Sequence, residues 1–152
     1  MRQHFIRIGF FSEEGDLIGT KDMTTSKTGK DEINLEDVES YYAVLPNFDD
    51  LSFVKVILDA GSLDFFTKSY GKIHEPLSRQ LILRAVYDMV LVHACSSDYL
   101  INLVTTIFAT EAESTIYNNA YELITDYMSN HAEKEVENKI KTVLFDHFIN
   151  KA

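Results

Sequence analysis

The hydrophobic period of the chain changes abruptly near Asp59, and this change limits the fold more than any other feature. Before Asp59, short segments rich in β-branched and aromatic residues alternate with turn sequences such as SEEGD and SKTGKD. Such segments are typical of antiparallel strands joined by hairpins. After Asp59, apolar residues recur every three to four positions, which is the period of an amphipathic helix. The sequence therefore predicts an α+β protein, with antiparallel strands first and helices afterwards.

Several segments before Asp59 have the composition of strands. In LSFVKVIL (51–58), Val54 and Val56 alternate with Phe53 and Lys55, so we expect a strand with one face on the core. The other expected strands are HFIRIGFF (4–11), DLIGTKDMTT (16–25), DEINLE (31–36) and YYAVL (41–45).

Five helices are expected after the strands. In SLDFFTKSYGKI, Ser62 has an N-cap position and Gly71 a C-cap position, and Pro76 suits the first turn of the next helix. The later helices are expected at about 76–94, 97–109, 113–129 and 133–150. Because the connectors are short, neighbouring helices should be antiparallel. We therefore divide the chain into a strand segment (1–60) and an array of α-helical hairpins (61–152).

The helix expected at 76–94 has very little polar surface. Gln80, Arg84 and Asp88 recur every four positions and form one narrow stripe, while apolar residues cover most of the remaining circumference. Such a helix should pack on more than one side. Arg84 and Asp88 lie at positions i and i+4, so we expect them to form a structural ion pair along the helix.

The sequence has no recognisable catalytic or metal-binding motif. It contains five histidines but no H-E-x-x-H. The pair His131 and Glu135 lacks the further ligands that a zinc site needs. Asp49 and Asp50, which precede the segment 51–58, are more typical of turn and cap residues than of a calcium site. We therefore assign no catalytic residue, metal ligand or cofactor to this chain.

Composition excludes several partners. A net charge of −10 disfavours a phosphate-binding surface, so we expect no nucleic acid. We find no apolar run of about 18 residues, and the start MRQHFIRIGFF lacks the features of a signal peptide, so we expect no membrane association. The single cysteine, Cys95, cannot form an internal disulfide, which fits a reducing compartment. These features favour a cytoplasmic protein.

The stretch from about 44 to 90 resembles the aminopeptidase N family of zinc aminopeptidases, the gluzincins that include puromycin-sensitive aminopeptidase. The similar segments are VLPNFDDLSFVKVILDAGSLDFF and GKIHEPLSRQLILRAVYDMV. In that family, the corresponding stretch joins a small β-sandwich domain to a large α-helical domain. Tyr87 stands where the family commonly has Trp. The matched residues are Asn47, Asp49, Asp50, Leu51, Lys55, Ser62, Leu63, Pro76, Leu77, Ser78, Arg79, Asp88, Met89 and Val90.

The resemblance implies a non-catalytic part of a larger enzyme. The catalytic zinc site of the family lies upstream of the matched stretch, so zinc is expected in the catalytic domain of the parent protein. This chain would contact that domain and help to enclose peptide substrates, while the strand segment acts as a spacer. Asp49, Asp50, Asp59 and Ser62 would then cap the connections into the last sandwich strand and the first helix. The alternative is a small α-solenoid-like module that binds a protein partner.

The last expected helix, at 133–150, has apolar residues on two sides. A broad arc is expected to face the array, whereas Phe145 and Ile149 form a second patch opposite to it. The outer helix of a complete array normally has a polar outer face. We therefore expect homo-oligomerisation through Phe145 and Ile149. The residues of the broad arc are Val136, Ile140, Val143, Leu144 and Phe148.

Overall fold

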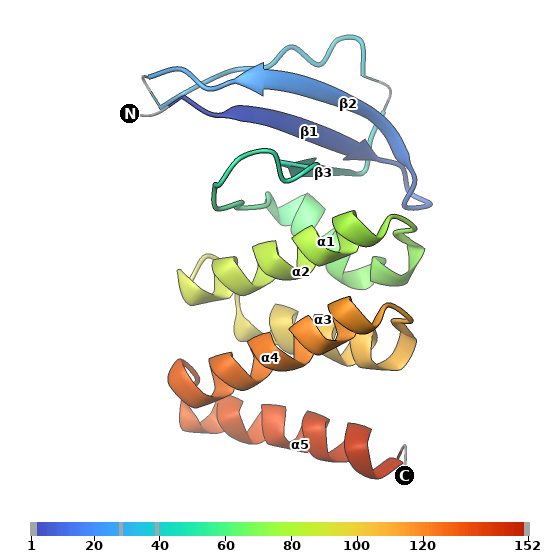
Figure 1. Ribbon diagram of the computed structural model, residues 1–152, viewed down its shortest axis with the longest axis vertical. Helices are drawn as coiled ribbons and strands as arrows, with labels where there is room; N and C mark the ends of the chain where they lie inside the picture. The colour runs from blue at the N-terminus through green and yellow to red at the C-terminus, as the bar shows by residue number, and fades with distance from the viewer. Residues whose placement is uncertain (1–2, 28, 39, 151–152) are drawn as a thin grey trace.

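The computed structural model describes residues 3–27, 29–38 and 40–150, and it places a small antiparallel sheet on a column of helices (Figure 1). This arrangement confirms the expected α+β class. In chain order the elements are β1 (Phe5–Phe11), β2 (Leu17–Thr24), β3 (Ala43–Pro46), α1 (Ala60–Lys68), the short 3-10 helix η1 (Tyr70–Lys72), α2 (Pro76–Leu91), α3 (Ser97–Thr110), α4 (Ser114–Asn130) and α5 (Lys134–Asn150).

The sheet has the strand order β2-β1-β3, and both pairings are antiparallel. The β1–β2 turn requires a glycine, because Gly15 has a φ of 90°. A Cβ atom at this position would also lie 2.6 Å from the carbonyl oxygen of Lys72. At the end of β1, Phe11 is buried and packs edge to face on Phe66 of α1, with 5.2 Å between the ring centroids. This contact joins the sheet to the helices.

Two of the expected strands are wrong: residues 31–36 and 51–58 form no strand. In the first, the Asn34 side chain accepts the N–H of Glu36, a local turn that competes with a strand ladder. The second cannot extend the sheet, because the outer edge of β3 offers few donors. The Val44 N–H is bound to Ser62 Oγ at 2.9 Å, and Pro46 has no N–H.

The helices form where they were expected, but three of their ends differ by two or more residues. α1 begins at Ala60 and its N-cap is Asp59, not Ser62. It ends at Lys68, so Gly71 lies in η1 and is not a C-cap. α2 ends at Leu91 and does not continue to residue 94, because His93 has a left-handed φ of 58° that a regular helix cannot contain.

One hydrophobic core runs from the sheet to the last helix. It includes Phe11 and Leu45 from the strands, the interior of α2, and Ile140 of α5. As expected, α2 packs on more than one side: it contacts α3 and α4, and its Met89 sulfur accepts the N–H of Leu58. Within the described residues, no helix is long and apolar enough to cross a membrane.

Candidate functional site

The turn between β3 and the segment 51–58 is held by Asn47, which is 3% exposed. Its Oδ1 accepts the N–H of Ser52 at 3.1 Å, and its Nδ2 donates to the Ser52 carbonyl at 2.8 Å and to Asp50 Oδ1 at 3.3 Å. Asn47 and Asp50 both have left-handed φ angles, 56° and 54°. Asp50 is therefore a turn residue. It does not lead into a sandwich strand, since residues 51–58 are not paired in the sheet.

Asp49 is held by an arginine that the sequence did not single out. Arg7 of β1 donates from Nη1 to Asp49 Oδ2 at 2.6 Å, and from Nε and Nη2 to the carboxylate of Asp22 at 2.6 and 3.0 Å. Hydrogen bonding from Arg7 holds the pKa of Asp22 below its ordinary value. The three side chains tie the turn to the β1–β2 hairpin, so Asp49 has a structural partner.

Asp59 and Ser62 join the start of α1 to the sheet. Asp59 accepts the Ser62 N–H at 3.0 Å and the Ser62 hydroxyl proton at 2.5 Å. The Ser62 hydroxyl oxygen in turn accepts the N–H of Val44 in β3. Hydrogen bonding from Ser62 lowers the pKa of Asp59. Ser62 thus donates to the capping residue Asp59 and also occupies the edge of the sheet.

The polar stripe of α2 lines a groove. The groove has a volume of about 590 Å³ and lies between residues 50–55, α2 and α4. Arg84 and Asp88 form the expected pair, with 3.5 Å between Arg84 Nε and Asp88 Oδ2. The Asp88 side chain is 11% exposed, whereas that of Arg84 is 60% exposed. Gln80 and Asn119 bring side-chain amides to the same groove.

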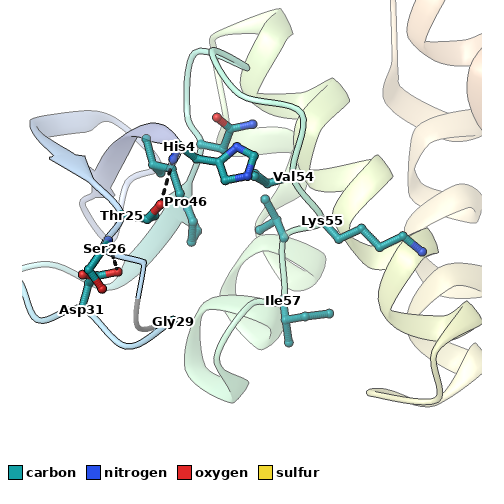
Figure 2. A pocket seen from close by; sticks show the side chains of 12 residues that line it. His4, Thr25, Ser26, Gly29, Asp31, Pro46, Val54, Lys55 and Ile57 are labelled. Carbon is teal, nitrogen blue, oxygen red and sulfur yellow. Dashed lines mark hydrogen bonds between the residues drawn. The ribbon is translucent and has the colours of Figure 1, made fainter. Parts of the chain in front are cut away.

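A second groove, of about 560 Å³, lies on the other side of the segment 51–58 (Figure 2). His4 and Thr25, which flank β1 and β2, form one wall, and residues 54–57 form the other. Figure 2 shows the Lys55 side chain pointing away from the strands. The two grooves leave residues 53–57 as a ridge between them.

Sequence reasoning missed the most buried ion pair in the described residues. Arg79 of α2 donates from Nε and Nη2 to the two carboxylate oxygens of Glu111, at 2.8 and 3.1 Å, and Tyr70 donates to the same carboxylate at 3.2 Å. Burial opposes ionisation of Glu111, but the Arg79 hydrogen bonds hold its pKa below its ordinary value. The sequence carried no signal for this pair, because the partners lie 32 residues apart.

Tyr87 also has a long-range partner. Its hydroxyl donates to Asp126 Oδ2 of α4, and burial with this hydrogen bond raises the pKa of Tyr87 to about 12. A tryptophan could not make this contact in the same way, since its only polar atom lies on the indole ring. Tyr87 therefore joins α2 to α4 through a specific hydrogen bond.

The outer face of α5 is apolar near its end. Phe145 and Ile149 are 64% and 58% exposed. Phe148, which was expected on the inner arc, is 50% exposed and contacts Tyr121 of α4 edge to face at 5.8 Å. On the inner face, His147 stacks on Phe108 of α3 at 4.6 Å. We call Phe145, Phe148 and Ile149 the α5 patch.

No model of a known protein family matches the chain, and no curated protein matches it. Within the described residues, no group of three or more His, Cys, Asp and Glu side chains is placed to hold a metal ion. The features that remain for a functional assignment are the shared core, the two grooves and the α5 patch.

Proposed function

We propose that this chain is a non-catalytic scaffold within a larger, cytoplasmic zinc aminopeptidase, where it joins a β-sandwich to a helical domain that encloses the peptide substrate. The observation that carries the proposal is the continuous core, which extends from Phe11 in the sheet to Ile140 in α5. A spacer must hold the domains on its two sides at a fixed distance and orientation. A core shared by the sheet and the helices makes these two parts move as one body.

The contacts at the junction support the same role. The Asp59–Ser62–Val44 hydrogen bonds connect α1 to β3, and the Phe11–Phe66 ring contact lies beside them. These interactions hold the direction of the helical array relative to the sheet. In the proposed parent protein, the catalytic domain carries the zinc ion, and this chain acts on peptides only by shaping the space around them.

A second candidate is an α-solenoid-like module that binds a protein partner. The observation that favours it is the α5 patch, where large apolar side chains are exposed together on the outermost helix. Contiguous exposed apolar groups of this kind mark protein–protein interaction sites. This candidate needs no catalytic domain and predicts a free protein of 17.4 kDa.

The native species distinguishes the two candidates. We would purify the protein from its source with an antibody against this chain, and then measure intact mass, zinc content and release of amino acids from aminoacyl fluorogenic substrates. The scaffold proposal expects a much larger polypeptide with bound zinc and chelator-sensitive activity. A species of 17.4 kDa without aminopeptidase activity would refute it and favour the interaction module.

The recombinant chain gives a second test. We expect it to bind no stoichiometric zinc after dialysis and to release no amino acid from the same substrates, because no ligand set for zinc was found in its sequence. A metal content near one per chain, with activity lost to a chelator, would contradict the scaffold role.

A further inference from the structure

The segment that connects the turn at Asn47 to α1 has an unpaired main chain at its centre. Its ends are held: both backbone groups of Ser52 bond to Asn47, and the Leu58 N–H bonds to Met89. Between them, the Val54 N–H bonds to the Ser52 carbonyl at 3.0 Å. The N–H and C=O groups of Phe53 and of residues 55–57 have no partner among the described residues. Such groups are strong donors and acceptors, and in an exposed extended segment they form a template for another strand.

The side chains of this segment have the alternation of a strand. Val54 and Val56 are partly buried, and Val56 packs against the core, whereas Phe53, Lys55 and Ile57 are exposed. Phe53 is fully exposed, at 104%, and Ile57 is 51% exposed. Alternation of exposure with a period of two is the side-chain pattern of a strand. The segment therefore has the side-chain pattern of a strand without the hydrogen bonds of one.

The sheet itself cannot supply the missing strand. The outer edge of β3 is occupied at Val44 by Ser62 and lacks a donor at Pro46. The grooves of about 560 and 590 Å³ on the two sides of the segment leave space for an added chain. The occupant that matches unpaired N–H and C=O groups is another polypeptide main chain, since side chains alone offer no regular ladder.

We propose that residues 53–57 bind an extended strand of a partner protein by β-strand addition, and that this strand has an acidic residue opposite Lys55 and apolar residues opposite Phe53 and Ile57. Opposite charges across paired strands are favourable and like charges directly opposite are unfavourable. A second copy paired symmetrically about Lys55 would place two lysines opposite each other, which favours a strand of different sequence. The inference stands on these residues and does not depend on the scaffold role.

The test uses two capped synthetic peptides as probes. One has the sequence TVTETVT, which places Val, Glu and Val opposite Ile57, Lys55 and Phe53 in the antiparallel arrangement. The matched control is TVTKTVT. Amide hydrogen exchange of the full chain is followed by NMR with each peptide at millimolar concentration. We expect alternate amides within 53–57 to exchange at least about tenfold more slowly with the Glu peptide, and to be unchanged by the Lys peptide.

Reversing the charge of Lys55 tests the preference for an acidic residue in the added strand. Lys55 is exposed, so Lys55→Glu should fold normally, and it should prefer the Lys peptide. Absence of protection by the Glu peptide in the native chain would overturn the proposal. Equal protection by both peptides, or an unchanged preference in Lys55→Glu, would refute the assigned chemistry. If the chain forms a dimer that is lost in Phe53→Ser but retained in Phe145→Asp, a second copy of the chain occupies this edge. That result would also overturn the proposal of a partner strand.

Discussion

The Arg79–Glu111 pair gives the sharpest stability prediction, and the perturbation is Glu111→Gln. The Glu111 carboxylate accepts four hydrogen bonds: two from Arg79, one from the Tyr70 hydroxyl and one from the N–H of Glu113. Only 3% of the Glu111 side chain and 14% of the Arg79 side chain is exposed. Glutamine has nearly the same shape, but it removes the charge and turns one acceptor into a donor that faces the arginine.

The expected loss is about 3 kcal/mol of unfolding free energy. Breaking a buried ion pair by removing one partner typically costs about 3 to 5 kcal/mol, because the other charge is left without compensation. We expect a loss at the lower end of this range, because Arg79 also donates from Nη1 to the carbonyls of Ile73 and His74. These hydrogen bonds remain in Glu111→Gln. A double replacement by Met, Arg79→Met with Glu111→Met, should lose less than either single replacement, because no buried charge remains.

Urea denaturation at pH 7 measures the effect as a lower midpoint with an unchanged m value. Glu113→Gln is the matched control: this carboxylate is exposed, and the change should stay within about 0.5 kcal/mol. The pKa of Glu111 is lower in the folded chain than the unfolded value of about 4.3. The ionised Glu111 carboxylate therefore stabilises the folded chain fully above that pH. This stabilisation is lost as the pH falls through the pKa of Glu111 in the folded chain. A loss below about 1 kcal/mol at pH 7, or one that does not shrink in acid, would refute the reasoning.

Three further predictions concern the residues singled out in the sequence. Asp88→Ala should lower stability by about 1 to 4 kcal/mol, since it removes a largely buried carboxylate that pairs with Arg84; an unchanged urea midpoint would contradict this. Asp59→Ala should cost about 0.5 to 2 kcal/mol through loss of the helix cap, and the same denaturation assay would exclude the cap if the midpoint stayed constant. The isolated chain should self-associate through the α5 patch, and light scattering over a concentration series should show monomers for the double variant Phe145→Asp, Ile149→Asp. A native chain that stays monomeric at all concentrations would count against the patch as an interface.

Much of the architecture follows from the sequence because its signals are local. The change of period near Asp59 predicted the order of strands and helices, and the four-residue spacing of Arg84 and Asp88 placed both on one face of α2. The exposure of Phe145 and Ile149 also follows from helical spacing alone. In each case, the physical cause acts within a few turns of helix or one strand, so a short window of sequence contains it.

The tertiary structure decided which extended segments became strands and which polar residues met. LSFVKVIL alternates as a strand should, yet it remains unpaired because Ser62 occupies the Val44 N–H and Pro46 offers none. Glu111 and Arg79 meet only because η1, α2 and the end of α3 converge. A strand needs a free edge and a buried ion pair needs a distant partner. Both conditions depend on how remote segments pack, which the period of a single segment does not contain.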